Sequence, residues 1–203
     1  MTLTLVKPFD RAPLSTHPPE FHWTADEFYR AASAGEFEDP NRLELVQGRL
    51  RRLMQGERHA NVRARLSRRL RIAIDPPLFV RDENPLHIAS DIELIPDLMA
   101  TYQEEYTGRH PLPEEAALLV EVADSSADYD LGEKANLYAQ AGIADLWVVL
   151  VNEAAIVQLR QPTQDGYEFI VKLSGADTIS PLALPNVTWS VNVLLSSPET
   201  TGV

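Results

Sequence analysis

The chain has 203 residues, which is enough for one well-buried core but not for two large domains. It contains no cysteine, which excludes disulfides, a thiolate-bound zinc ion and a cysteine nucleophile, and which fits a reducing cytoplasm. The net charge of −12 argues against broad non-specific binding to nucleic acid, and no apolar stretch approaches the roughly 20 residues that cross a membrane.

The first 20 residues predict an extended arm and not a signal peptide. They carry four prolines and no uninterrupted apolar run. A helix is expected to begin near Thr24, because Thr24 and Glu27 stand at the spacing of a capping box. The same helix is expected to end at Gly35, since glycine commonly follows the last helical residue.

Arginines dominate the next part of the chain. Residues 42–54, RLELVQGRLRRLM, predict a β-hairpin that carries Glu44. Residues 57–74, ERHANVRARLSRRLRIAI, predict an amphipathic helix whose apolar stripe is surrounded by arginines. Ten of the 18 basic residues lie between Arg42 and Arg71, and all ten are arginines. Two interpretations stay open for them, a solvated helix packed by its stripe or a local basic face on an acidic protein.

Short strand candidates fill the chain between residues 77 and 102, and a polar loop follows them. ALLVEVA is apolar on both faces of its pleat, which predicts a central strand. A helix over about 130–142 is expected next, with Asp130 as its N-cap. Three consecutive strands, DLWVVLV, AAIVQLRQ and YEFIVKL, follow, and NVTWSVNVLL predicts a last strand or an extended tail. This order favours one α/β or mixed α+β domain over residues 21–195, with a tail over residues 196–203.

A glutamate interrupts the central apolar run. Glu121 shares a strand face with Leu119 and Ala123, so we expect it to be at least partly buried. An ionised carboxylate in such a place needs a partner, which can be a metal ion, a cationic side chain or a proton. Lys134 lies near the middle of the apolar stripe of the following helix and is expected to point toward the sheet. Two interpretations stay open for Glu121 and Lys134: a buried ion pair with no catalytic role, or part of an active site.

A second acidic residue belongs to the same argument. Asp97 follows Pro96 within strand-like sequence, and proline confines strand pairing to an edge or a bulge. An aspartate and a glutamate on neighbouring strands form a pocket of hard oxygen ligands suited to Mg²⁺ or Mn²⁺. Lys134 beside such a metal would orient or deprotonate a water, or stabilise a pentavalent phosphate. A carboxylate pair can also serve a glycosidase, which requires no lysine.

The order Pro96-Asp97, Glu121, Lys134 resembles the PD-(D/E)xK nuclease superfamily, with the lysine moved to the helix after the acid. More narrowly, residues 22–195 resemble the Uma-two family of putative restriction endonucleases. The segments that carry this resemblance are RLELVQGRL, RHANVRARLSRRL, IPDLMA, LLVEVADSSADYDLGEKANLYAQAGI and DLWVVL, of which the block at 118–148 is the most specific.

The resemblance implies a restriction-endonuclease-like core with a central mixed β-sheet flanked by helices. It implies a metal-dependent endonuclease that hydrolyses DNA, with Mg²⁺ or Mn²⁺ held by Asp97 and Glu121. Lys134 would lie beside the scissile phosphate, Glu44 would be a further acid, and His59 would help to position substrate or water. The arginines expected to contact the phosphate backbone are those of the helix, Arg58, Arg65 and Arg68 among them, together with Arg49, Arg51 and Arg52.

An alternative is a nuclease-like module that keeps the pocket but serves only as a DNA-binding or protein-interaction subunit. Metal-dependent cleavage of plasmid DNA distinguishes the two. Cutting both strands of a duplex would favour a two-fold homodimer. We expect a cytoplasmic protein with DNA as its partner, no membrane association and no organic cofactor.

Overall fold

A computed structural model of the chain describes residues 20–74 and 76–197. The predicted arm, except for its last residue, and most of the predicted tail lie outside these ranges. No helix in the described ranges is long and apolar enough to cross a membrane. In chain order the helices and strands are α1 (Ala25–Ser33), β1 (Leu43–Val46), β2 (Arg49–Arg52), α2 (Glu57–Ala73), β3 (Phe79–Asp82), β4 (Leu86–Ala89), β5 (Ile92–Leu94), β6 (Leu98–Thr101), β7 (Ala116–Ala123), α3 (Ala127–Leu131), α4 (Glu133–Gln140), β8 (Asp145–Leu150), β9 (Ala155–Thr163), β10 (Gly166–Ser174), β11 (Thr178–Ile179), β12 (Trp189–Ser190) and α5 (Val191–Leu195).

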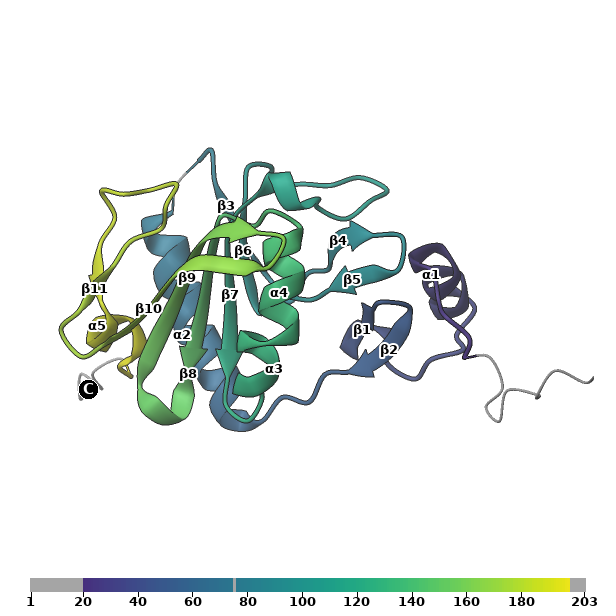
Figure 1. The fold of residues 1–203 in the computed structure, drawn as a ribbon, viewed down its shortest axis with the longest axis horizontal. Helices are drawn as coiled ribbons and strands as arrows, with labels where there is room; N and C mark the ends of the chain where they lie inside the picture. Colours follow the sequence, from purple (N-terminus) through teal and green to yellow (C-terminus); the bar gives the residue numbers. More distant parts are fainter. Residues whose placement is uncertain (1–19, 75, 198–203) are drawn as a thin grey trace, which may run out of the picture.

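Six strands form the main sheet in the order β10-β9-β8-β7-β6-β3 (Figure 1). The strands β7 and β8 are parallel, and the other neighbouring pairs are antiparallel. The helices α3 and α4 connect the parallel pair, as a crossover between parallel strands requires. The strand β7 has a partner on each side and is buried on both faces, which confirms the prediction of a central strand.

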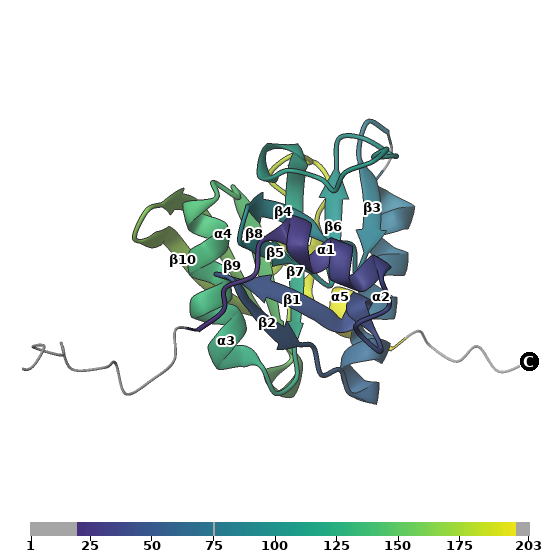
Figure 2. The same cartoon turned by 90° about the vertical axis from the view of Figure 1, so that its right-hand side faces the viewer.

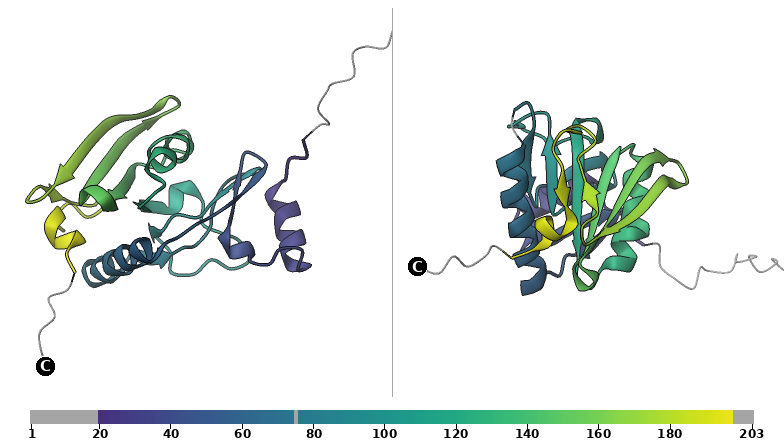
Figure 3. Two further views of the ribbon diagram at one scale, coloured as in Figure 1. Left: turned by 90° about the horizontal axis from the view of Figure 1, so that it is seen from below. Right: turned by 90° about the vertical axis from the view of Figure 1, so that its left-hand side faces the viewer.

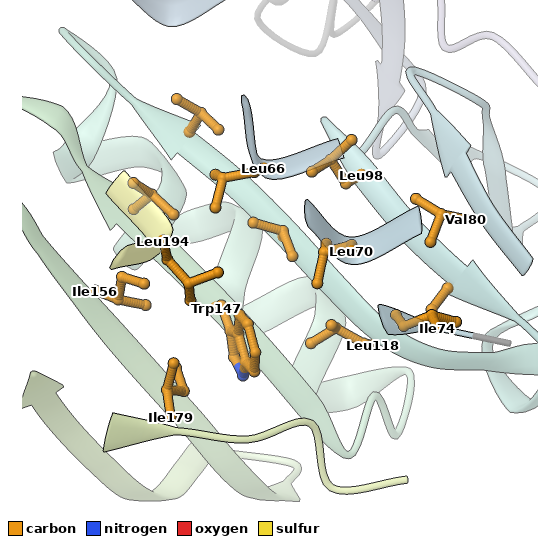
Figure 4. Packing of buried hydrophobic residues seen from close by; sticks show 14 of the residues in the cluster. Leu66, Leu70, Ile74, Val80, Leu98, Leu118, Trp147, Ile156, Ile179 and Leu194 are labelled. Carbon is orange, nitrogen blue, oxygen red and sulfur yellow. The ribbon is translucent and has the colours of Figure 1, made fainter. Parts of the chain in front are cut away.

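Helices cover both faces of this sheet (Figures 2 and 3). On one face, Leu66 and Leu70 of α2 and Leu194 of α5 pack with Leu118 and Trp147 of the sheet (Figure 4). On the other face, residues of α4 pack with those of β7 and β8, and Tyr138 is fully buried there. The central mixed sheet flanked by helices is the architecture that the sequence predicted.

The two N-terminal elements also form as predicted. The helix α1 starts from the capping box, in which Thr24 and Glu27 each accept a hydrogen bond from the backbone N–H of the other. The strands β1 and β2 form a hairpin that pairs Val46 with Arg49. Its two turn residues have positive φ angles, 50° at Gln47 and 78° at Gly48, which match the twist of the strands they connect.

A smaller sheet of four strands, in the order β2-β1-β5-β4, lies beside the α4 face of the main sheet (Figure 1). Leu86 and Leu94 from this sheet are fully buried and belong to the same apolar cluster as Met99 and Leu119 of the main sheet. The chain passes from β5 to β6 through Pro96, which therefore stands between the two sheets and not within a ladder. The connection brings β1 of the small sheet close to β7 of the large one.

Two predictions of secondary structure were wrong. The helix expected over 130–142 consists of two helices, and Gly132, not Asp130, is the N-cap of α4. Gly132 has φ −100° and ψ −102°, and a Cβ on it would lie 2.5 Å from the carbonyl oxygen of Asp128, so only glycine fits this break. The last predicted strand is confined to β12, because Ser190 caps α5 and Val191 is buried as the first residue of that helix.

Candidate active site

Five charged residues from five elements are buried together between the two sheets. Four are carboxylates and one is an ammonium, and each is at most 6% exposed. They are Glu44 of β1, Asp97 immediately before β6, Glu121 of β7, Asp130 of α3 and Lys134 of α4. All but Glu44 line a cleft of about 230 Å³. The three residues predicted as a catalytic core, and the predicted further acid, are therefore neighbours in the fold.

Lys134 holds the centre of this group. Its Nζ atom lies 2.8 Å from Oε1 of Glu44 and 2.9 Å from Oε1 of Glu121. It also donates a hydrogen bond to the backbone carbonyl of Ile95, at 3.2 Å. The predicted pairing of Glu121 with Lys134 is present, and Lys134 bridges two acidic residues from different sheets.

Glu44 is fully buried and does not face solvent as a hairpin residue commonly does. Its Oε1 atom accepts a hydrogen bond from the backbone N–H of Ile95, at 2.9 Å, besides contacting Lys134. The Tyr129 hydroxyl lies 3.4 Å from its other oxygen. Glu44 thus fastens the hairpin of the small sheet to the cleft and fixes the place of the Lys134 ammonium.

Asp97 is held by the main sheet and by α2. Leu98 of β6 pairs with Val120 of the antiparallel β7. Asp97, one residue before Leu98, therefore lies next to Glu121, one residue after Val120. Its Oδ2 atom accepts a hydrogen bond from the backbone N–H of Val122, at 2.7 Å. His59 Nε2 lies 2.9 Å from Oδ1 and 3.0 Å from Oδ2. Pro96 stands in the connection between β5 and β6, and the side chain of Asp97, which follows it, lines the cleft.

His59 is 7% exposed and lines the cleft while contacting Asp97. Its Nδ1 atom is buried and has no hydrogen-bond partner among the described residues. A histidine beside an arginine-rich helix is commonly exposed, but this one is buried in the first turn of α2, where it contacts Asp97. Its contact with both carboxylate oxygens means that His59 positions Asp97.

Asp130 and Tyr138 also belong to this group, although neither was predicted as a site residue. Asp130 accepts a hydrogen bond from the Ser126 hydroxyl, at 2.5 Å, and faces the cleft because the break at Gly132 sets α3 apart from α4. The Tyr138 hydroxyl donates to Oε1 of Glu121, at 2.7 Å. The position of Tyr138 on the same helical stripe as Lys134 was the signal that could have identified it.

The electrostatics of the group follow from one ammonium among four buried carboxylates. Burial raises the pKa of Glu121 well above its ordinary value, and Asp97 adds to this effect while Lys134 opposes it. Burial likewise raises the pKa of Asp130. Burial alone would lower the pKa of Lys134, but the carboxylates of Glu121 and Glu44 raise it well above its ordinary value. Lys134 is therefore an ammonium at neutral pH, and the group favours one more proton or another cation.

Arginines stand at the mouth of the cleft. Arg51 and Arg52 of β2 line it, and the guanidinium carbon of Arg51 lies 3.3 Å from the centre of the Tyr129 ring. This contact is a cation–π interaction that holds the guanidinium over the opening. Arg51 also lies 3.9 Å from Glu133. The hairpin therefore supplies positive charge beside the acidic interior.

The structure does not bring the arginines predicted on α2 into the cleft. Arg58 donates a hydrogen bond to Asn152, at 2.9 Å, and lies 3.6 Å from Asp124. Arg65 and Arg68 line a separate hollow on the outer side of α2. Any contact of these two residues with a ligand would lie outside the cleft.

A divalent cation fits the chemistry of this group. The residues that would hold it are Asp97 and Glu121, which stand one residue beyond the paired Leu98 and Val120, and Lys134 supplies a single positive charge among four buried carboxyl groups. Within residues 20–74 and 76–197, no three His, Cys, Asp or Glu side chains form a group that could hold a metal ion by themselves. Mg²⁺ is compatible with this, since it commonly uses one or two carboxylates and completes its shell with water and phosphate oxygens.

Comparison with known proteins agrees with these features. The model of the Uma2 family, described as "Putative restriction endonuclease", matches residues 25–193. A crystal structure of a putative nuclease belonging to DUF820 from Anabaena variabilis ATCC 29413 has a TM-score of 0.64 with this chain. The two chains are 15% identical over 85% of this chain and 97% of that one, which shows a shared fold. No curated protein matches the chain.

Proposed function

Because the chain belongs to the Uma2 family, we propose that it is a metal-dependent endonuclease that hydrolyses phosphodiester bonds of DNA. The observation that carries this proposal is the place of Lys134, an ammonium between the carboxylates of Glu44 and Glu121 at the base of the cleft. A phosphate entering the cleft would lie in the field of this ammonium and beside the carboxylates of Asp97 and Glu121, which are suited to a cation. A glycosidase needs no such lysine.

A divalent cation held by Asp97 and Glu121 would lower the pKa of a water and offset the negative charge on the phosphate oxygens. His59 and the backbone N–H of Val122 keep the Asp97 carboxylate in place for this task. The Tyr138 hydroxyl does the same for Glu121. Hydrogen bonds of this kind, from residues that do not themselves bind the metal, hold the metal ligands in a fixed orientation.

Lys134 acts as a fixed positive charge in this proposal and not as a base. The carboxylates around it raise its pKa, so it keeps its proton at neutral pH. From the base of the cleft the ammonium stabilises the charge that develops on the phosphate oxygens in the transition state. Of the roles that the sequence left open for Lys134, stabilising phosphate is the one that this environment favours.

Arg51 and Arg52 guide the DNA backbone to the cleft. Both belong to the hairpin whose other strand carries Glu44, so substrate contact and catalytic centre share one rigid element. The planar guanidinium of Arg51, stacked on Tyr129, presents its N–H groups in a fixed orientation. For DNA binding, the local positive charge at the cleft mouth then matters more than the net negative charge of the whole chain.

Cleavage of supercoiled plasmid DNA tests the proposal. We expect nicking or linearisation with Mg²⁺ or Mn²⁺, none with a chelator, and none for Glu121→Gln with either metal. The matched control is Glu114→Gln, an exposed glutamate away from the cleft, which should cut at the parent rate. DNA binding without cleavage under every metal would show that the domain is a silent binding module, and the nuclease proposal would be wrong.

A further inference from the structure

The strand β10 forms an outer edge of the main sheet. It spans nine residues, Gly166–Ser174, and pairs along its length with β9. Figure 2 shows it on the side of the sheet opposite β3. In the described part of the chain no other strand pairs with β10, so the backbone groups on its outer side are open to another strand as far as Leu173, while Ser174 is bonded to Asp177. Such an edge is a template for pairing with a further chain unless it is short, covered or broken.

Apolar side chains are exposed at the middle of this strand. Phe169 is 42% exposed and Ile170 is 61% exposed, and both are among the large apolar residues that the fold leaves uncovered. They are flanked by the exposed charged residues Glu168 and Lys172. The edge therefore combines open backbone groups, an apolar centre and one charge of each sign.

We propose that β10 is the dimer interface of this protein, where it pairs antiparallel with β10 of a second copy about a two-fold axis at Ile170. In a strand, the backbone N–H and C=O groups of alternate residues point to opposite sides. Two identical antiparallel strands therefore pair about a two-fold axis only if the axis passes through a residue. If the axis passed between two residues, groups that point toward the second copy would lie opposite groups that point away from it. With Ile170 at the axis, every residue of β10 lies opposite a residue of the second copy, from Gly166 opposite Ser174 onward. Ser174 itself already bonds to Asp177 through its backbone N–H and C=O, so the strand ends contribute less than its middle. A centre at any other residue leaves part of the strand unpaired.

The side chains fit this register. Glu168 of one copy lies opposite Lys172 of the other, and this ion pair occurs twice because the axis repeats it. Phe169 lies opposite Val171 of the second copy, which is a favourable cross-strand pair of an aromatic and a β-branched residue. Charges on an edge strand normally prevent pairing between copies, but here they stand at equal distances on either side of Ile170 and attract.

The same symmetry indicates that the strand pairing with β10 is a second copy of β10. A partner of uniform charge would be repelled by either Glu168 or Lys172, whereas a second copy of this strand matches both. Within one chain Lys172 already contacts Glu153, and both side chains are about half exposed, so the ammonium remains within reach of a second carboxylate. The inference concerns assembly and does not depend on the proposed nuclease activity.

Charge reversal tests the register. The full-length protein should sediment as a dimer, and Glu168→Lys or Lys172→Glu alone should shift it to monomer at the same concentration. The double variant, Glu168→Lys with Lys172→Glu, should restore the dimer because the opposite pairs are re-formed. A parent that is monomeric at every concentration would overturn the proposal. So would a dimer that both single variants leave intact, or monomeric singles that the double variant does not restore.

A cysteine at the axis gives a second measurement that does not rely on charge. The parent has no cysteine, so Ile170→Cys introduces a single thiol that lies opposite itself across the axis. Directly opposed Cα atoms in an antiparallel pair are about 4.5–5.5 Å apart, within the range that a disulfide spans. Oxidised glutathione should convert this variant to a covalent dimer, while Leu182→Cys, at an exposed site in the turn between β11 and β12, should stay monomeric on a denaturing gel. Equal crosslinking of both variants, or none at position 170, would refute the register.

Discussion

The Lys134 ammonium lies 2.9 Å from Oε1 of Glu121, and both side chains are at most 3% exposed. A buried pair of this kind is not by itself stabilising, because the cost of desolvating two charges can exceed their attraction. Here the lysine also contacts Glu44, and two further carboxylates face the same cleft. The group thus holds four carboxyl groups and one ammonium, and the proposed cation would add the positive charge that a single lysine does not supply.

Replacing Lys134 with Met separates its structural and chemical roles. Methionine keeps the flexible apolar stem and loses the ammonium, leaving Glu44 and Glu121 without their cationic partner. In chelator we expect a loss of about 3–5 kcal/mol in the free energy of unfolding. Saturating Mn²⁺ should recover most of this loss, because the cation offsets the same carboxylates. DNA cleavage should still fall by about 10²–10³-fold, as expected for a lost charge at a transition state.

Urea titrations with and without Mn²⁺ measure the stability of this variant, and plasmid cleavage measures its activity. Full recovery of stability together with cleavage at the parent rate would show that Lys134 has no chemical role. A loss of stability that Mn²⁺ does not change would contradict the cation site.

Replacing His59 with Gln should weaken metal binding without removing a ligand. His59 contacts both oxygens of Asp97, so its loss lets that carboxylate turn away from the cleft. Changes to residues that orient metal ligands cost about 10–100-fold in affinity or activity. Titration calorimetry with Mn²⁺ measures the effect, and His22→Gln, at an exposed histidine, is the control. Unchanged affinity in His59→Gln would mean that Asp97 needs no support or binds no metal.

Much of the architecture could be predicted from periodicity and capping. The capping box at Thr24, the apolar stripe of α2 and the two-faced apolar run of β7 each depend on local spacing, and local spacing decides those elements. The break at Gly132 could not be predicted in this way, because it depends on the close approach of the Asp128 carbonyl. The predicted grouping of Asp97, Glu121 and Lys134 followed from strand order and a resemblance. Glu44, which only the resemblance indicated, joins them through contacts between the two sheets, and Asp130 joins them through the break at Gly132. No local pattern encodes either contact.

The stability of the metal-free protein should depend on pH through Glu121. Burial raises the pKa of this carboxyl in the folded state, while in the unfolded chain it returns to its ordinary value near 4.5. Above pH 4.5 the unfolded state gives up the proton more readily than the folded state does. The contribution of Glu121 to stability is therefore lost as the pH rises from 4.5 toward the folded-state pKa.

Glu121→Gln cannot ionise and provides the comparison. The melting temperature of this variant in chelator should exceed that of the parent by a margin that grows as the pH is raised from 4.5 to neutral. Mn²⁺ should raise the melting temperature of the parent at neutral pH and not that of the variant. A margin that stays constant with pH would show that Glu121 is ionised throughout.

The salt dependence of DNA binding should identify which arginines contact phosphate. Arg51 and Arg52 line the mouth of the cleft, whereas Arg65 and Arg68 line a hollow on the outer side of α2. Each phosphate contact that is lost reduces the slope of log affinity against log salt concentration by about 0.9 on duplex DNA.

If the cleft mouth receives the DNA backbone, Arg51→Gln with Arg52→Gln should flatten the slope by about 1.8, the sum of two such contacts. Arg65→Gln with Arg68→Gln removes the same charge and should leave the slope close to that of the parent. Fluorescence anisotropy with a catalytically silent Glu121→Gln background measures both pairs. A flattened slope for the α2 pair alone would place the DNA across the outer face of that helix and would contradict the role given to the hairpin.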